Sequence, residues 1–138
     1  MEKKITATNV LKNAMLADTK SRLAVLTVLM KNRGPASIDQ IEKKVGSQAN
    51  YVTLYRVLKQ LVEKGIVYQA DFRQGKAFFE YQTHHHHHVT CSGCGVREEV
   101  GSCISETVLK KARIESQKFK VITSHSLEFF GLCTKCTR

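Results

Sequence analysis

The sequence predicts an α+β protein made of two small domains, for two reasons. Three stretches with helical periodicity and a pair of β-rich stretches follow one another in the first part of the chain. All six histidines and all five cysteines lie in the second part, beyond residue 82. A chain of 138 residues is long enough for one ordinary domain or two small ones, and the change in composition favours two. We therefore expect domains at residues 1–82 and 83–138.

The charge of the chain points to a polyanionic partner. Lys and Arg number 22 against 12 Asp and Glu, which gives a formal net charge of +10, and residues 1–82 hold 14 of the basic and 7 of the acidic side chains. Nucleic acid is preferred to a membrane, because no apolar run approaches the roughly 18 residues of a spanning helix. The start, MEKKITATNV, lacks the apolar core of a signal peptide, so the expected location is the cytoplasm.

The helical stretches have recognisable ends. SRLAVLTVLMKN has apolar side chains at helical spacing and Asp18 or Thr19 to cap its start. IDQIEKKV lies between Ser37, the expected N-cap residue, and Gly46, which ends the helix. The stretch YVTLYRVLKQLVEK then shows an apolar stripe, which we expect at Val52, Tyr55, Leu58, Leu61 and Val62. IVYQADF and GKAFFEYQ follow as a hairpin, and this order of elements predicts a winged helix-turn-helix domain.

The third helix is the expected recognition helix, since its first residues are of the kinds that reach base edges and phosphates. The DNA-binding candidates are Asn50, Tyr51, Thr53, Tyr55 and Arg56. The alternative is a helical scaffold whose basic side chains are merely solvated, with Tyr55 partly in the core. The order of the elements and the basic charge of this half favour DNA binding.

Two cysteine pairs carry the strongest chemical signal. Cys91 and Cys94, and Cys133 and Cys136, are each separated by two residues, and 38 residues separate the pairs. Five cysteines in a reducing compartment indicate metal ligation rather than disulfides. Four thiolates suit a closed, structural zinc site. Redox dithiols and an iron–sulfur cluster are the less favoured alternatives, because the spacing of a cluster motif is absent.

Five consecutive histidines, 84–88, precede the first cysteine pair. In an extended strand, His84, His86 and His88 face one way, and His85 and His87 face the other, so one strand could serve two sites. Imidazole suits zinc, iron, nickel or copper, and mixed nitrogen and carboxylate ligation exchanges more readily than four thiolates. The run thus favours metal sensing over a solvated tract or an engineered tag, which would sit at a terminus.

The second half is also expected to contain one helix and two strands. SCISETVLKKARIES predicts a helix capped by Ser102, with Cys103 as a small packed side chain rather than a ligand. KFKVIT and SLEFFGLC alternate well enough to predict two strands, whose packed residues are expected to be Phe119, Val121, Leu127 and Phe129.

Three segments together, TLYRVLKQLVEKGIV, HHHHVTCSGCG and HSLEFFGLCTKC, resemble the ferric uptake regulator family of metal-responsive repressors, and the likeness extends from about residue 10 to the end. The resemblance implies a winged-helix domain followed by an α/β dimerisation domain. It also implies a homodimer that binds double-stranded operator DNA when loaded with a divalent corepressor metal (Fe²⁺, Zn²⁺ or Mn²⁺), and structural zinc at the four paired cysteines. A zinc enzyme with Glu106 as general base, or a metal buffer, would not need the basic winged helix, and nothing indicates a pocket for a small organic substrate.

The resemblance also assigns residues. It implies an inter-domain regulatory site at Glu80, His86 and His88, and it matches Tyr55 and Arg56 to the DNA-contacting pair of the family. A second site is implied at His85, His87, Glu106 and His125. Pro35 and Ala36 stand where iron-binding members often have a histidine, and Asp71 is a possible substitute ligand. A histidine at position 87 is similar to the zinc-responsive branch of the family, whereas a glutamate at position 80 is not, so the resemblance does not assign a branch. A peroxide sensor of the same family would share nearly all these residues.

Overall fold

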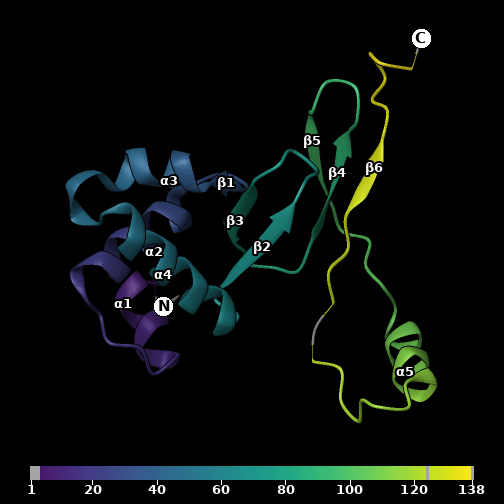
Figure 1. Cartoon of the computed structure of the whole chain (residues 1–138), viewed down its shortest axis with the longest axis horizontal. Coiled ribbons are helices and arrows are strands. Elements are labelled where there is room, and N and C mark those ends of the chain that lie inside the picture. The colour runs from purple at the N-terminus through teal and green to yellow at the C-terminus, as the bar shows by residue number, and fades with distance from the viewer. Residues whose placement is uncertain (1–3, 124, 138) are drawn as a thin grey trace. The chain divides into compact units, whose positions relative to one another are not determined.

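The computed structural model describes residues 4–123 and 125–137. The chain divides into two compact units, with the division between Thr83 and His84. Each unit is described by itself, and Figure 1 labels their elements.

The first unit is a winged helix-turn-helix. Its helices are α1 (Ala7–Asn13), α2 (Lys20–Lys31), α3 (Ile38–Val45) and α4 (Tyr51–Glu63), with a short 3₁₀ turn at Gly46–Gln48. Its strands are β1 (Ala36–Ser37), β2 (Val67–Asp71) and β3 (Ala77–Tyr81). The three expected helices and the hairpin are all present, whereas α1 and the two-residue β1 were not expected.

Side-chain caps explain where the helices begin. Thr19 caps α2 by accepting a hydrogen bond from the backbone of Arg22. Ser37 caps α3, and the side chain of Gln40 accepts a hydrogen bond from the backbone of Ser37 in return, which completes a capping box. Asn50 caps α4 through the backbone N–H of Thr53, 2.8 Å away. Asn50 therefore has a structural role at the start of the expected recognition helix.

Apolar side chains from all four helices and the hairpin form one core. Its buried members are Leu11, Val25, Leu26, Leu29, Ala36, Ile41, Val45, Ala49, Leu54, Val57, Leu58, Leu61, Val67 and Phe79. The stripe expected on the third helix was wrong in part. Val52 and Tyr55 are 64% and 58% exposed, and Leu54 and Val57 take the buried positions. The side chain of Gln60 accepts hydrogen bonds from Arg22 of α2, so a polar contact also links α2 to α4.

The wing is a three-stranded sheet in the order β1-β3-β2. Val67 and Phe79 join the helical core, whereas Phe78, one residue along β3, packs with Ala70 and Phe72 in a separate small cluster. This alternation follows from the pleat, which sends successive side chains to opposite faces. Glu80 lies opposite Tyr68 in the antiparallel register and shares the face of Phe78.

The second unit contains a small mixed sheet and one helix. Its elements are β4 (His87–Cys91), β5 (Arg97–Val100), α5 (Glu106–Glu115) and β6 (Phe129–Gly131), and the sheet order is β5-β4-β6. β4 pairs antiparallel with β5 and parallel with β6. The start of β4, the end of β5 and the start of β6 therefore lie at one end of the sheet. The end of β4, the start of β5 and the end of β6 lie at the other.

Three expectations for this unit were wrong. Ser105, not Ser102, caps α5 by accepting a hydrogen bond from the backbone of Val108. Residues 118–123 form no strand, and only Phe129–Gly131 of the second expected strand is paired. Phe119 and Val121 are 68% and 69% exposed in the single chain, and Phe129 is also exposed.

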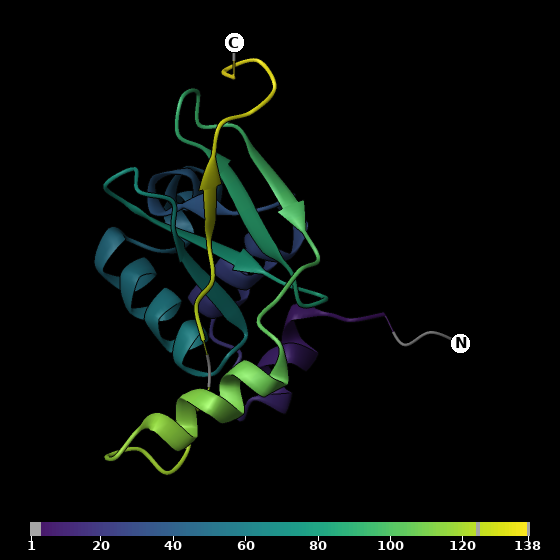
Figure 2. The same cartoon turned by 90° about the vertical axis from the view of Figure 1, so that its right-hand side faces the viewer.

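The second unit exposes much apolar surface. No residue of α5 is buried, and Val108 and Ile114 on this helix are 51% and 76% exposed. Figures 1 and 2 show α5 standing apart from the sheet of its own unit. Among the described residues, both clusters of buried apolar side chains belong to the first unit. No helix in the described parts of the chain is long and apolar enough to cross a membrane.

Candidate functional site

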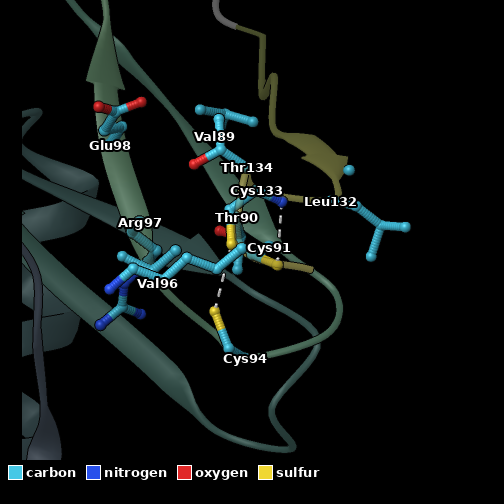
Figure 3. A pocket seen from close by; sticks show the side chains of 12 residues that line it. Val89, Thr90, Cys91, Cys94, Val96, Arg97, Glu98, Leu132, Cys133 and Thr134 are labelled. Atoms are coloured by element: carbon cyan, nitrogen blue, oxygen red, sulfur yellow. Dashed lines mark hydrogen bonds between the residues drawn. The ribbon is translucent and has the colours of Figure 1, made fainter. Parts of the chain in front are cut away.

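Four cysteine thiols form the first candidate metal centre. Cys91 ends β4, Cys94 lies in the turn after it, and Cys133 and Cys136 follow β6. The parallel pairing of β4 and β6 brings the two cysteine pairs to the same end of the sheet. The four sulfur atoms all lie within 4.8 Å of one another, and Sγ of Cys94 is 3.7 Å from Sγ of Cys133. Figure 3 shows Cys91, Cys94 and Cys133 gathered beside one another.

The sulfur spacing fits zinc. Zinc–sulfur bonds of about 2.3 Å in a tetrahedron give sulfur–sulfur distances of about 3.8 Å, close to the separation of Cys94 and Cys133. Four thiolates fill the tetrahedron and leave no position for a substrate or water. The cluster is therefore suited to a structural ion, which would tie the end of β4 to the segment after β6.

Two thiols of this cluster differ in acidity. Backbone N–H groups, chiefly that of Cys133 at 3.3 Å from the sulfur, lower the pKa of Cys91 from 9.0 to about 6. Hydrogen bonds that the Cys136 thiol donates to the neighbouring sulfurs, first that of Cys133, raise the pKa of Cys136 to about 12. The protein groups alone thus favour a thiolate at Cys91 and a thiol at Cys136. A divalent ion bound to all four sulfurs would stabilise the fully deprotonated set.

Gly93 allows the two cysteine pairs to lie close together. A Cβ atom at this position would lie 2.9 Å from Sγ and 3.2 Å from Cβ of Cys136. The sequence CSGC therefore lets the turn approach the second cysteine pair more closely than any residue with a side chain would.

A second cluster lies at the opposite end of the same sheet. His87 begins β4 and His85 lies two residues before it, Cys103 comes from the loop between β5 and α5, and His125 comes from the segment before β6. One ligand atom from each residue lies within 4.8 Å of all the others. Burial, together with the charges that His85 and His125 would carry, lowers the pKa of His87 below 6.5, which favours the neutral imidazole that a metal requires.

Cys103 and Glu106 depart from expectation here. Cys103 is exposed and contacts three imidazoles, so the expectation of a packed apolar side chain was wrong. Glu106 begins α5, its side chain is 82% exposed, and its carboxylate lies 3.5 Å from the ammonium of Lys110. The structure therefore groups Cys103, rather than Glu106, with the three histidines. The sequence signal that could have indicated this ligand was the presence of a cysteine three residues before Glu106.

The other histidines follow the alternation expected of an extended segment. Ring centroids of His84 and His86 lie 4.9 Å apart, those of His86 and His88 5.0 Å, and those of His85 and His87 4.7 Å. Glu99 of β5, which no sequence motif indicated, lies 2.8 Å from Nε2 of His84 and 3.8 Å from Nδ1 of His86. Glu99 is also the cross-strand partner of His88, so strand pairing brings a carboxylate to this face of the run.

The carboxylates predicted for the regulatory site belong to the first unit. The carboxylate of Glu80 lies near the loop before β1, since a Cβ at Gly34 would be 3.9 Å from its Oε2 atom. Pro35, in that loop, stands where a histidine ligand was expected. Asp71 is paired with Ala77 and so points to the opposite face of the hairpin from Glu80, and its carboxylate accepts a hydrogen bond from the backbone of Arg73. The pleat therefore disfavours Asp71 as a substitute ligand beside Glu80.

The start of α4 presents an exposed polar and aromatic face. Tyr51 and Tyr55 are 51% and 58% exposed, and Arg56 and Lys59 are exposed beside them, while Thr53 is half-buried. Tyr51, Tyr55 and Lys59 follow one another at intervals of four residues, with Arg56 next to Tyr55, whereas Leu54, Val57 and Leu58 turn into the core. Two amphipathic rings with a guanidinium and an ammonium are suited to phosphate and base-edge contacts.

The model of the ferric uptake regulator family matches residues 13–130. The chain belongs to the ferric uptake regulator family. The ferric uptake regulation protein of Vibrio anguillarum is 36% identical over 129 residues, which cover 89% of this chain and 85% of that protein. The crystal structure of the Vibrio cholerae ferric uptake regulator has a TM-score of 0.63 at 33% identity, covering 91% of this chain and 98% of that one. The regulator from Francisella tularensis, solved with iron, has a TM-score of 0.62 at 25% identity, covering 89% and 96%.

Membership of the ferric uptake regulator family confirms the predicted family and the α+β fold, a winged helix followed by an α/β domain. Proteins of this family are metal-dependent transcriptional regulators that bind DNA. The main functional prediction, a metal-responsive DNA-binding repressor, is thereby confirmed as well.

Proposed function

We propose that this family member is a homodimer that represses transcription by binding double-stranded operator DNA through α4 when a regulatory divalent metal is bound. The observation that carries the proposal is the exposed face of α4. A metal buffer would need the cysteine and histidine clusters but would have no use for exposed Tyr55 and Arg56 on a basic winged helix. A DNA target, together with thiols that must stay reduced to hold zinc, supports a cytoplasmic site of action.

The proposed DNA contacts are made by the exposed face of α4. Tyr51, Tyr55 and Arg56 reach base edges and phosphates, and Thr53 supports them at the margin of the contact. Asn50 acts through the helix, because its side chain already accepts the backbone N–H of Thr53 and so fixes the start of α4.

The proposed regulatory ligands are Glu80 of the wing with His86 and His88 of the histidine run. His86 and His88 face the same way, their ring centroids being 5.0 Å apart. Residues 82–86 join β3 to β4, so an ion bound by Glu80 and by these imidazoles would restrict the connection between the two units. Metal would thus shift the population toward orientations in which two recognition helices match the DNA. Fe²⁺, Zn²⁺ and Mn²⁺ are the candidate ions, since imidazole and carboxylate together suit all three.

The exposed apolar surface of the second unit supports the homodimer. Val108, Ile114, Phe119 and Val121 are each at least half exposed, on α5 and the segment after it. A second copy of this surface would bury them, which stabilises association by roughly 25 cal/mol per Å² of apolar area removed from water. Zinc at the four cysteines would hold together the sheet of the same unit.

The test is selection from a pool of random-sequence DNA duplexes by purified protein, with Fe²⁺, Zn²⁺ or Mn²⁺ added or omitted. The proposal expects one enriched inverted repeat that appears only with metal, because a two-fold dimer reads a two-fold site. Arg56→Ala should lose the enrichment, and Lys64→Ala, which removes an exposed positive charge at the other end of α4, should keep it. Equal enrichment without added metal, or loss in both variants alike, would refute the proposal.

A further inference from the structure

The cluster at the start of β4 has an unusual set of donor atoms for a site predicted to contain a carboxylate. Sγ of Cys103 lies 3.0 Å from Nε2 of His85, 3.1 Å from Nε2 of His87 and 3.2 Å from Nε2 of His125. The Nε2 atoms of His85 and His87 are 3.1 Å apart. Four ligand atoms from three segments thus converge, and all three imidazoles present the same nitrogen.

Hydrogen bonds alone account poorly for this arrangement. A thiol has one proton to donate, yet three imidazole nitrogens surround this sulfur. The nitrogens of His85 and His87 and the sulfur of Cys103 form a nearly equilateral triangle. Seen from any one of these atoms, the other two lie about 60° apart. An N–H group that points at one of them is therefore badly misaligned with the other. A cation at the centre would engage all four atoms at once.

The distances fit a small tetrahedral ion. Zinc–nitrogen bonds of about 2.0–2.1 Å and a zinc–sulfur bond of about 2.3 Å give nitrogen–sulfur edges of about 3.5 Å. The three observed edges, 3.0–3.2 Å, would need to open by only a few tenths of an ångström. The ligand set is complete without Glu106, whose carboxylate is exposed and lies beside Lys110.

We propose that His85, His87, His125 and Cys103 form a closed site with one thiolate and three imidazoles, which selects Zn²⁺ over Mn²⁺. The thiolate is a soft ligand that zinc accepts, whereas manganese favours carboxylate, carbonyl and water oxygens and a higher coordination number. Four protein ligands leave no open position, so the ion does no chemistry on a substrate.

The bound ion has a structural consequence within the second unit. It ties the loop entering α5 and the segment entering β6 to the start of β4. These are the two connections that flank the exposed apolar surface of residues 108–122. A bound ion would therefore order the surface that we assign to the dimer interface. This structural role rests on the proposed function, whereas the identity of the four ligands does not.

Cobalt reports the ligands directly. The zinc-loaded full chain is titrated with Co²⁺, with zinc content measured to show that the four-cysteine site keeps its ion. The site predicts intense sulfur-to-cobalt charge-transfer absorption in the near ultraviolet, together with the strong visible bands of tetrahedral cobalt. Cys103→Ser should abolish the charge-transfer band, and, because Cys103 is exposed, this variant is expected to fold. Glu106→Gln is the matched control and should leave both bands unchanged.

A second variant tests selectivity. Cys103→Asp replaces the thiolate by a carboxylate and should lower the preference for Zn²⁺ over Mn²⁺ roughly tenfold or more in a competition titration. The inference is overturned if cobalt binds without a charge-transfer band, if the band survives in Cys103→Ser, or if Glu106→Gln abolishes it. None of these readouts involves DNA, so a protein that shows the band but fails the duplex selection would keep this site and lose the proposed function.

Discussion

The two units of this protein hold their shapes by different means. The first surrounds a continuous apolar core to which all four helices and the hairpin contribute. In the second, the described residues form no such cluster, and its sheet instead carries groups of cysteine and histidine ligands at its two ends. Hydrophobic burial is always present in water, whereas ligation depends on an ion being available. The comparison suggests that the first unit is the permanent scaffold and that the second is the part whose order follows metal supply.

The largest expected effect comes from removing the structural zinc. Cys133→Ser should lose this zinc, the structure of the second unit and the dimer together, because a structural zinc supplies about 10–16 kcal/mol of folding free energy in small metal-dependent domains. The first unit should keep its helices. Zinc analysis, sedimentation and circular dichroism measure the three quantities.

Cys103→Ser is the matched control for that variant and should retain the zinc of the four-cysteine site. A zinc-free but dimeric Cys133→Ser protein would show that the second unit does not depend on the ion, and the contrast between the two units would fail.

A substitution in the apolar core of the first unit tests the other side of the comparison. Leu54 of α4 is fully buried, so Leu54→Ala should destabilise the first unit by about 2–5 kcal/mol through lost burial and the cavity left behind. The four-cysteine zinc should stay in place, since its ligands belong to the other unit. Denaturant unfolding followed by helical circular dichroism, with zinc measured in parallel, checks both points. Val52→Ala, an exposed position on the same helix, should change stability by less than about 0.5 kcal/mol.

The histidine run sharpens the comparison inside the second unit. His86→Ala and His88→Ala should raise the metal concentration needed for DNA binding, by roughly 10- to 100-fold if the lost imidazole is a ligand or supports one. His85→Ala and His87→Ala should instead weaken the dimer, since they belong to the cluster at the entrance to α5. Measuring DNA binding and sedimentation of each variant at increasing metal concentration distinguishes the two pairs of histidines. Equal small losses in all four variants would contradict the assigned alternation.

The smallest expected effect is at the DNA surface. Arg56→Ala should leave folding and zinc unchanged but weaken DNA binding, and the slope of log affinity against log salt should fall by about 0.9 if one phosphate contact is lost. An unchanged slope with an altered base preference would place Arg56 on a base edge instead.

Local features of the sequence were predicted better than features that depend on distant segments. The caps at Ser37 and Thr19 and the paired cysteines were predicted because their signals span only a few residues. Cys103 was misjudged because it lies in an irregular loop, where the direction of a side chain depends on the path of the chain rather than on periodicity. Tyr55 was placed on the wrong face because alternative apolar spacings run along α4, and only packing against α2 and α3 selects between them. The strand expected at 118–123 is absent from the described chain, because alternation of apolar residues alone does not supply the neighbouring strand that pairing requires.

The uniformity of the histidine run gives the protein an unusual tolerance to changes in length. Positions 85–88, counted back from Cys91, supply both faces of the strand, and His84 is a further histidine before them. If one histidine were deleted, every one of these four positions would still hold a histidine, and the connection between β3 and β4 would shorten by about 3.3 Å. In a run of mixed residues the same deletion would exchange the two faces and destroy both sites. A repeat of identical ligands therefore allows the connection between the units to vary in length over generations without a change in what either face of the strand can bind.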